Sequence, residues 1–367
     1  MSKAQKMNKY YDFRSDRESY PEAWLYIIVG GRNTGKTYST LKYYLEENEP
    51  IVFTKRTNKD VNALCAGNKL GKKAAKYDID LSPYKSINRD TGSRMKAFKV
   101  QEGLGAFYQV GDENEPSGVP SSYIASLHAV NDIKGFDLSE CEAVVFDEFI
   151  PQPWSRIDRK EGEQLADLYT TIKRDRSLRG RGELKLVLLA NAVNIWNPTL
   201  EVFGLIDTVA ELSIKGVETW YDPIRKIFIR ILKTPEEMKH AEEGTGIYET
   251  MKDTDWGRMA FNNDFGYNDF SRIRKVALKG YRAICKVYHK NSYFYIYRNE
   301  EGFWYVTKSP SNLKELKEYN LKEEMFQRLF WYDVVIDLLN DAIEGHAYFE
   351  SYSFYDIIVN YKKRFFL

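Results

Sequence analysis

Cysteine is scarce in this sequence of 367 residues, and the three cysteines follow no recognised pattern. Cys65, Cys141 and Cys285 form no CxxC motif and no paired spacing. Such spacing indicates neither a disulfide framework nor a zinc site. We therefore expect a protein of a reducing compartment.

Net charge and long apolar runs are lacking as well. The 54 basic and 53 acidic residues leave a net charge of only +1, which excludes a histone-like binder, so any nucleic-acid contact must depend on local basic clusters. No apolar run approaches the roughly 20 residues that cross a bilayer, and the N-terminal stretch MSKAQKMNKYYDFRSDRESYPEAW is polar throughout. We therefore expect a soluble, cytosolic protein with no membrane partner.

Aromatic residues, in contrast, are abundant, with 27 Tyr and 20 Phe. In the C-terminal third, the alternating segments YFYIY and FWYVT predict strands whose aromatic side chains form a sheet core. The chain is too long for one comfortable core, so we expect two domains.

Short, unbroken apolar runs predict a parallel sheet in the first half of the chain. Residues 24–30 (WLYIIVG), 142–149 (EAVVFDEF) and 185–193 (KLVLLANAV) have the pattern of buried strands, and PIVFTKR from Pro50 predicts another. Helical segments separate several of these runs. The first domain is therefore expected to be of the α/β class with a central parallel sheet.

The pattern becomes charged and irregular near the middle of the chain. We place a linker at residues 208–228, between a first domain at residues 1–207 and a second domain at residues 229–367. The later segment YRAICKVYHKNSYFYIYRNEEGFWYVTKS predicts three antiparallel strands, with the first tight turn at Lys290-Asn291. Helical segments follow these strands, so the second domain is expected to be small and of the α+β class.

A glycine-framed lysine follows the first predicted strand and precedes a predicted helix. The spacing Gly30-x4-Gly35-Lys36-Thr37 matches the phosphate-binding loop of nucleotide triphosphatases at every fixed position. Such a loop points backbone N–H groups at phosphate oxygens, while the lysine contacts the β- and γ-phosphates and the threonine ligates Mg²⁺. The residues expected to hold ATP here are Gly30, Gly31, Arg32, Asn33, Thr34, Gly35, Lys36 and Thr37.

An acidic pair ends another predicted strand, AVVFDEF. Asp147 is placed to hold Mg²⁺, and Glu148 is placed to orient and deprotonate an attacking water molecule. An enzyme that transfers the phosphate to a substrate hydroxyl would not need Glu148. The pair therefore predicts ATP hydrolysis, and a surface acidic pair without function is the alternative.

Hydrolysis at such a site usually needs a further cation, often supplied by a neighbouring subunit. Arg174 and Arg176 in the segment TTIKRDRSLRGRG are the candidates, and a solvated role is the alternative for each. Asn191, at the end of the last apolar strand, is placed to sense the γ-phosphate through its amide. It could equally be a polar strand terminus.

These motifs together resemble one family, the DNA-encapsidation ATPases of small tailed phages of the phi-29 type, which are relatives of the large terminase subunits. The resemblance rests on IVGGRNTGKTY, AVVFDEFI and LVLLANAVNIWNP, in that order and at similar spacing. Weaker similarity continues through FNNDFGYNDF and KGYRAICKVYHKNSYFYIY to GHAYFES, so it covers nearly the whole chain.

The resemblance implies a P-loop NTPase of the additional-strand, terminase-like type and a ring-forming motor, with a pentamer as the suggested assembly. Such a motor uses ATP and Mg²⁺ to thread double-stranded DNA through the phage portal into a preformed procapsid. A structural packaging RNA is a further partner that the resemblance implies. The expected location is the host cytoplasm, with transient residence at the portal vertex of the procapsid.

The resemblance also assigns roles to single residues. Arg32 matches an arginine of the loop in the terminase-like branch, and Lys134, thirteen residues before Asp147, matches a functional basic residue of the family. Arg174 matches the proposed arginine finger, although RGRG at residues 179–182 has the character of an insertion.

Two further positions match the family's pattern. Asn191 matches a coupling or sensor position at the end of the strand that follows the arginine finger. Basic residues also occur in the family after the second strand, and Lys55 and Arg56 both remain candidates there.

The second domain resembles a reduced RNase H-type nuclease. A working nuclease of that class needs two or three carboxylates around metal ions, one of them on the first strand, yet GYRAICKVY contains no acidic residue. We therefore expect a vestigial nuclease domain that binds DNA, the portal or an RNA. Its basic residues, for which a solvated strand edge is the alternative, are Arg272, Arg274, Lys275, Lys279, Arg282 and Lys286.

The leading hypothesis from the sequence is an ATP-driven translocase of double-stranded DNA. One competing hypothesis is a terminase large subunit with an active nuclease. Another, from a different class, is a nucleotide-gated assembly or RNA-binding module in which slow hydrolysis acts only as a timer.

Overall fold

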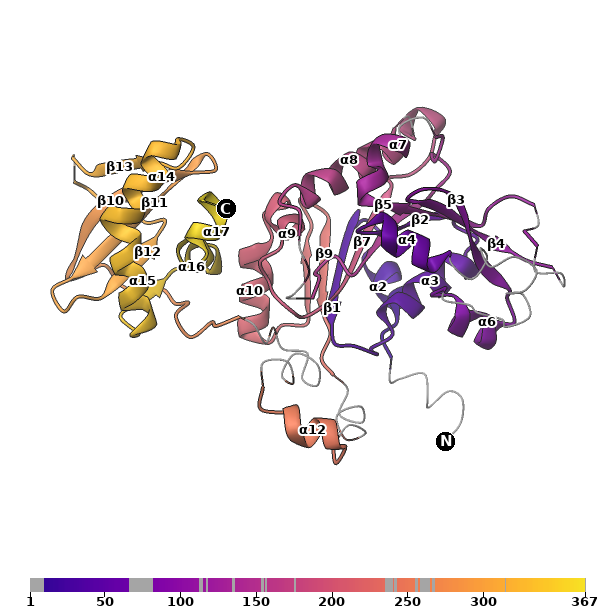
Figure 1. Cartoon of the computed structure of the whole chain (residues 1–367), viewed down its shortest axis with the longest axis horizontal. Helices are drawn as coiled ribbons and strands as arrows, with labels where there is room; N and C mark the ends of the chain where they lie inside the picture. The colour runs from indigo at the N-terminus through magenta and orange to yellow at the C-terminus, as the bar shows by residue number, and fades with distance from the viewer. Residues whose placement is uncertain are drawn as a thin grey trace. The chain divides into compact units, whose positions relative to one another are not determined.

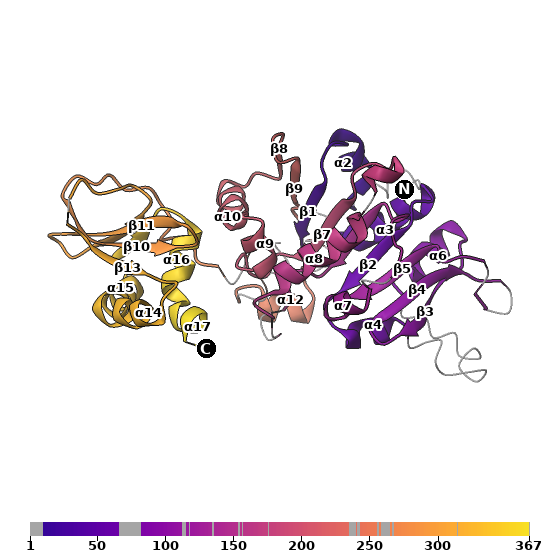
Figure 2. The same cartoon turned by 90° about the horizontal axis from the view of Figure 1, so that it is seen from above.

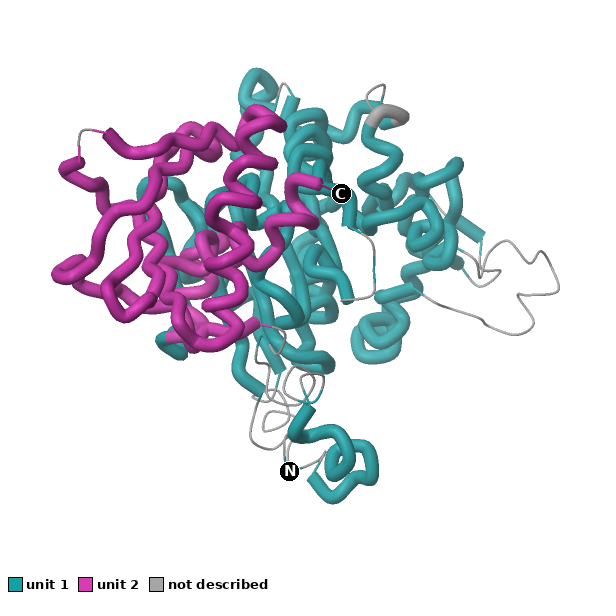
Figure 3. The backbone as a smooth tube through the Cα atoms, turned by 60° about the vertical axis from the view of Figure 1, so that its left-hand side comes forward, with its two compact units in different colours: residues 1–205, 215–267 teal, residues 206–214, 268–367 magenta. Residues whose placement is uncertain are grey.

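The computed structural model describes most of the chain and divides it into two units. Unit 1 comprises residues 1–205 and 215–267, and unit 2 comprises residues 206–214 and 268–367 (Figure 3). The described residues are 10–65, 82–111, 115–116, 118–133, 136–152, 155, 157–174, 176–234, 240, 243–254, 257, 265, 268–313 and 315–366.

A nine-stranded sheet forms the centre of unit 1, in the order β3-β4-β5-β2-β6-β7-β1-β9-β8. Figure 1 labels most of these strands and the helices around them. The pairs from β5 to β9 are parallel, while β3, β4 and β8 add antiparallel edges. The strands are β1 (Leu25–Gly30), β2 (Ile51–Lys55), β3 (Met95–Gln101), β4 (Leu104–Gln109), β5 (Ser122–Ser126), β6 (Ala143–Asp147), β7 (Lys185–Asn191), β8 (Thr219–Asp222) and β9 (Ile227–Ile231).

Helices connect the parallel strands of this sheet. The helices are α2 (Phe13–Ser19), α3 (Lys36–Glu46), α4 (Asn58–Leu64), α6 (Lys85–Thr91), α7 (Val130–Ile133), α8 (Glu161–Lys173), α9 (Pro198–Val202) and α12 (Gly246–Met251), with single 3₁₀ turns η3 (Leu127–Ala129) and η4 (Ser177–Arg179). The crossover from β1 to β2 and the crossover from β6 to β7 run in opposite directions along the sheet. Because both are right-handed by rule, α3 and α8 lie on opposite faces (Figure 2).

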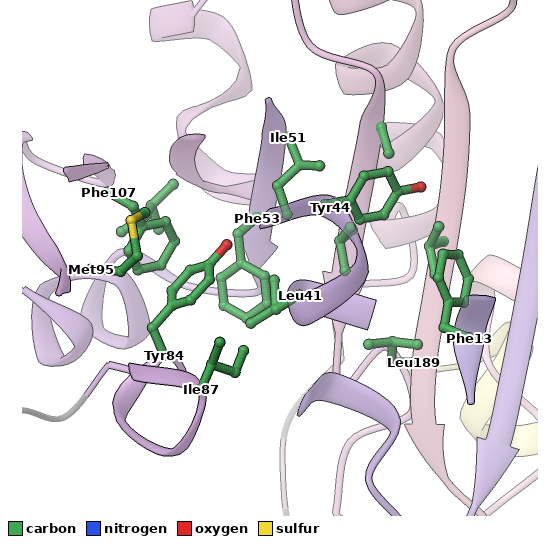
Figure 4. Packing of buried hydrophobic residues seen from close by; sticks show 14 of the residues in the cluster. Phe13, Leu41, Tyr44, Ile51, Phe53, Tyr84, Ile87, Met95, Phe107 and Leu189 are labelled. Carbon is green, nitrogen blue, oxygen red and sulfur yellow. The ribbon is translucent and has the colours of Figure 1, made fainter. Parts of the chain in front are cut away.

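Buried aromatic and aliphatic side chains hold the α3 face of the sheet together (Figure 4). Tyr84 meets Phe107 edge to face, with ring centroids 4.8 Å apart. Full burial of each such side chain contributes about 1.5–3 kcal/mol. The labelled members of this core are Phe13, Leu41, Tyr44, Ile51, Phe53, Tyr84, Ile87, Met95, Phe107 and Leu189.

Unit 2 contains a five-stranded sheet in the order β13-β10-β11-β12-β14. Its strands are β10 (Tyr281–His289), β11 (Ser292–Asn299), β12 (Trp304–Thr307), β13 (Lys317–Asn320) and β14 (Ala347–Phe349). Its helices are α10 (Ile206–Lys215, of which residues 206–214 belong to the unit), α14 (Glu324–Phe330), the π-helical turn η5 (Trp331–Val335), α15 (Ile336–Ile343), α16 (Tyr352–Val359) and α17 (Tyr361–Phe365).

The predicted antiparallel strands of unit 2 are confirmed. β10 pairs antiparallel with β11, and β11 pairs antiparallel with β12. Lys290 and Asn291 both have positive φ, 47° and 63°, as the tightest hairpin turns require. The alternating aromatic pattern and the polar turn were therefore sufficient signals for this hairpin.

The predicted linker at residues 208–228 is wrong. Much of it forms α10 and β8, and β9 pairs in parallel with β1, so the first residues of the expected second domain belong to the first sheet. The chain passes finally into unit 2 at residue 268. The segment IFIRI has four β-prone apolar residues and a single charge, and it becomes a strand beside β1, a long-range pairing that the local pattern does not specify.

The broad fold class is confirmed: unit 1 is α/β with a large, mainly parallel sheet, and a second sheet follows in unit 2. None of the helices in the described ranges is both long and apolar enough to span a membrane.

Candidate nucleotide site

The predicted phosphate loop connects β1 to α3. Gly35, the residue before α3, has φ of 87°, and Asn33 has φ of 61°, so the backbone turns sharply twice within the loop. A Cβ on Gly30 would lie 2.7 Å from the Cβ of Leu232, which leaves no room for a side chain there. The backbone N–H of Tyr11 donates to the carbonyl of Thr34 at 2.9 Å and holds the loop from outside.

Lys36 lies buried beneath this loop, with 8% of its surface exposed. Its Nζ donates to the carbonyls of Gly30 (3.1 Å) and Gly31 (2.6 Å) and to the side chains of Thr34 (3.2 Å) and Asn191 (3.3 Å). Burial lowers the pKa of Lys36 to about 8, although the charges of Asp147 and Glu148 act in the opposite direction. The ammonium group is therefore held by neutral oxygens and lacks a direct anionic partner.

Asp147 ends β6 beside two donors from neighbouring elements. Thr37 Oγ1 donates to one carboxylate oxygen at 2.9 Å, and Lys55 Nζ donates to the other at 2.7 Å. Burial lowers the pKa of Lys55, but Asp147 and Glu148 outweigh this effect and the pKa is raised overall. The structure thus distinguishes the two candidates after β2, because Lys55 donates to the carboxylate of Asp147, whereas Arg56 donates to backbone carbonyls of the turn that follows.

The oxygens of Thr37 and Asp147 suit Mg²⁺, which takes oxygen ligands and commonly binds through one or two protein groups plus substrate phosphates. The described ranges hold no group of three or more His, Cys, Asp or Glu that could bind a metal by themselves. The residues present therefore fit an ion brought in with a nucleotide.

Glu148 follows β6 with φ of 60°, a left-handed conformation that costs a non-glycine residue free energy. Arg56 maintains this turn by donating to the carbonyls of Glu148 and Phe149, each at 3.0 Å. Arg56 is itself paired with the buried Glu161 at 2.5 Å, and Asn197 donates to the Phe149 carbonyl at 2.8 Å. Strain supported from several sides is typical of functional positions.

Most of the predicted nucleotide-site residues line a single cavity of about 360 Å³. The order of the strands brings them together, because Gly30 is in register with Asn191, and Asp147 is in register with Leu189. Gly30 and Gly31 contribute carbonyls to Lys36 and do not line the cavity. Its lining residues are Arg32, Asn33, Thr34, Gly35, Lys36, Thr37, Tyr38, Asp147, Glu148, Gln152, Ala190 and Asn191.

The three candidate cations outside the loop fall into different positions. Arg174 is the C-cap residue that follows α8, is exposed and does not line the cavity of its own chain. Arg176 is unsuited to a trans-acting role, because it is 2% exposed and donates to the carbonyls of Ser139 and Cys141. Lys134 lies outside the described residues.

Sequence reasoning missed several residues that shape the site. Tyr38 and Gln152 line the cavity, while Glu161 and Asn197 support the Glu148 turn through Arg56 and Phe149. The motif spacing contained no signal for these residues. Their positions at the site depend on packing between elements that are far apart in the chain.

Several basic residues of unit 2 are engaged within the unit. Arg274 lies over the ring of Tyr348, with 3.6 Å from its guanidinium carbon to the ring centroid. Lys286 pairs with Glu318 at 2.7 Å, and Arg272 donates to the Gly345 carbonyl at 2.9 Å. Nucleic-acid binding by this unit stays a prediction.

The fold and the site define a class, an α/β protein with a cavity at the carboxyl end of its parallel strands. The cavity lies where a loop connects β1 to α3. No family model matches the sequence, and a comparison with curated proteins finds no match.

Two solved structures are similar over nearly the whole chain. The phi-28 gp11 DNA packaging motor has a TM-score of 0.59 at 16% identity, covering 98% of this chain and 99% of that one. The bacteriophage phi-29 viral genome packaging motor assembly has a TM-score of 0.60 at 16% identity, covering 97% and 99%. The N-terminal domain of the phi29 DNA packaging ATPase scores 0.42 at 17% identity over 61% of this chain and 97% of that one, too low to support an argument. The first two similarities establish a shared fold.

Proposed function

We propose that this chain is an ATP-hydrolysing subunit of a motor that packages double-stranded DNA into a preformed phage procapsid. The observation that carries the proposal is one cavity in which Lys36, the Thr37–Asp147 hydrogen bond and Glu148 meet. A triphosphate needs a cation, Mg²⁺ needs oxygen ligands, and attack by water needs a base. The cavity has a residue for each requirement.

The strand order supports assignment to the additional-strand, terminase-like P-loop NTPases. β7 lies between β1, which leads into the loop, and β6, which ends in Asp147. One extra strand thus separates the phosphate loop from the acidic strand end. Asn191, at the end of that strand, contacts Lys36 and is suited to sense the γ-phosphate.

Binding of ATP is expected to redirect Lys36. Its contacts with the carbonyls of Gly30 and Gly31 would give way to phosphate oxygens, which attract the ammonium group more strongly than neutral acceptors do. Thr37 and Asp147 would hold Mg²⁺, which when bound neutralises part of the phosphate charge. Lys55 orients Asp147 through its hydrogen bond, and the exposed Arg32, which lines the cavity, is proposed to contact phosphate.

Glu148 is the proposed base. Its carboxylate accepts a proton from the attacking water, and the turn fixed by Arg56 keeps it in place at the cavity. Arg174, exposed and outside its own chain's cavity, is proposed to complete the site of a neighbouring subunit. Lys134 is proposed as a second trans-acting residue on the basis of the sequence resemblance alone.

The fold similarity to the phi-28 and phi-29 motors over at least 97% of the chain supports the biological part of the proposal. We accordingly propose a homo-oligomeric ring, with a pentamer as the suggested assembly, that acts on double-stranded DNA at the phage portal and that a packaging RNA assists. Unit 2 is proposed to be a vestigial RNase H-type domain that binds nucleic acid or portal without cutting DNA.

The test compares Glu148→Gln with Glu163→Gln, an exposed acid on α8 as matched control. Glu148→Gln should bind ATP as the wild type does and lose turnover by about 10²–10⁴-fold, because general-base catalysis contributes that much. Glu163→Gln should retain turnover. Normal hydrolysis by Glu148→Gln would refute the assigned base.

Motor function is tested separately by adding double-stranded DNA to the wild type at low salt. Turnover should rise, and the increase should weaken with added salt because backbone contacts depend on phosphate charge. ATPase activity indifferent to DNA would favour the timer hypothesis, and metal-dependent cleavage of the DNA would favour the nuclease hypothesis.

A further inference from the structure

Gln152 differs from the other residues around the cavity in one respect. It lines the cavity together with Asp147 and Glu148, and its side-chain oxygen is buried without a hydrogen-bond partner. Among the described residues that line the cavity, no other buried side-chain oxygen or nitrogen is unsatisfied in this way. A buried amide oxygen without a donor costs free energy, so a donor is expected to arrive when the site is filled.

Several donors in and beside the cavity are already engaged with other acceptors. Lys36 is bound to loop carbonyls, and Thr37 and Lys55 both donate to Asp147. Arg56 donates to Glu161 and to the carbonyls of the Glu148 turn. None of these donors reaches the Gln152 oxygen, and a ligand of the cavity can supply the donor that it lacks.

The chemistry of the ligand restricts the choice further. The phosphate oxygens of ATP near neutral pH are acceptors and cannot satisfy an amide oxygen. A water molecule can, because it carries two O–H donors. The attacking water would then donate one hydrogen bond to Glu148 and the other to Gln152.

We propose that Gln152 orients the water molecule that attacks the γ-phosphate, an inference that rests on the proposed ATPase function. The water oxygen forms a bond to the γ-phosphorus while the bond from that phosphorus to the bridging oxygen breaks, and its electron pair leaves with ADP. Glu148 receives the proton. Gln152 accepts a hydrogen bond throughout and is chemically unchanged, as a water-positioning glutamine in other nucleotide hydrolases is.

The decisive variant is Gln152→Met, which keeps the length of the side chain and removes the acceptor. Gln101→Met, at the exposed end of β3, is the matched control. We expect Gln152→Met to lower kcat by about 10²-fold, the usual effect of misplacing a reacting group, with KM unchanged. Gln101→Met should leave both constants unchanged.

Binding of phosphate analogues gives a second, non-catalytic measurement. ADP with beryllium fluoride imitates bound ATP, whereas ADP with aluminium fluoride imitates the planar transition state together with the attacking water. Gln152→Met should weaken binding of the aluminium fluoride complex at least 10-fold and leave binding of the beryllium fluoride complex unchanged. A purely structural defect would weaken both.

The outcomes separate this inference from the proposed function. If the wild type hydrolyses ATP, Glu148→Gln does not, and Gln152→Met is fully active, only the role of Gln152 is refuted. Equal weakening of both analogue complexes would also refute it, by showing that Gln152 contacts phosphate or supports the fold. A wild type that neither binds nor hydrolyses ATP would refute the proposed function itself.

Discussion

Lys36 lies in an environment that differs strongly from that of an ordinary exposed lysine. It is buried and surrounded by neutral acceptors, and its pKa falls from 10.5 to about 8. The loop thus holds its cation at a free-energy cost. A shift of this size corresponds to about 3 kcal/mol.

This cost predicts a pH dependence of stability. Between about pH 8 and pH 10.5 the unfolded chain holds a proton on Lys36 that the folded chain has released, so the free energy of unfolding should rise with pH in that window. Below pH 8 both states are protonated and the full cost is present. Other groups such as Lys185 titrate in this window in both proteins, so denaturant unfolding should show a more positive pH slope for the wild type than for Lys36→Met, and equal pH slopes would contradict the prediction.

At the scale of elements, the segment from Arg176 to Arg181 joins two crossover connections. Arg176 pairs with Glu142 at 2.7 Å, Arg179 pairs with Asp137 at 2.9 Å, and Arg181 donates to the Glu140 carbonyl at 2.9 Å. The RGRG stretch therefore fastens the end of α8 to the segment that leads into β6.

The buried member of this group should matter most for stability. Arg176→Met removes the donor to the carbonyls of Ser139 and Cys141 and one of the two ion pairs of Glu142. It should lower the free energy of unfolding by about 3–5 kcal/mol, because each buried acceptor left unsatisfied costs about 1–3 kcal/mol. Arg179→Met removes an exposed pair, which solvent screens, and should have a much smaller effect on the free energy of unfolding. Chemical unfolding of the two variants measures both values, and a small effect for Arg176→Met would contradict the buried connection.

At the scale of the whole molecule, the exposed Arg174 predicts that one subunit completes the site of the next. Subunits carrying Arg174→Ala and subunits carrying Glu148→Gln should each be inactive as pure assemblies. Mixing them should restore part of the ATPase activity, because some sites then combine an intact base with a neighbour's intact arginine. No recovery across mixing ratios, with assembly verified, would place Arg174 outside the shared site.

Short motifs with strong local requirements were predictable from the sequence. The glycine spacing, the apolar strands and the Asp147–Glu148 strand end each depend on a few neighbouring residues, and the structure confirms that these segments meet in one cavity. The same local character made the Lys290-Asn291 turn predictable. The roles of these residues in hydrolysis stay predictions.

Only the tertiary structure decided which residues are brought to the site from a distance. The placement of β9 beside β1, the choice of Lys55 for Asp147, the burial of Arg176 and the unsatisfied oxygen of Gln152 all depend on contacts between segments far apart in the chain. Local sequence specifies backbone conformation and apolar periodicity, whereas partner choice follows from the packing of the whole sheet. The local sequence therefore determined the conformation of the loop between β1 and α3, and the tertiary fold determined which residues surround that loop.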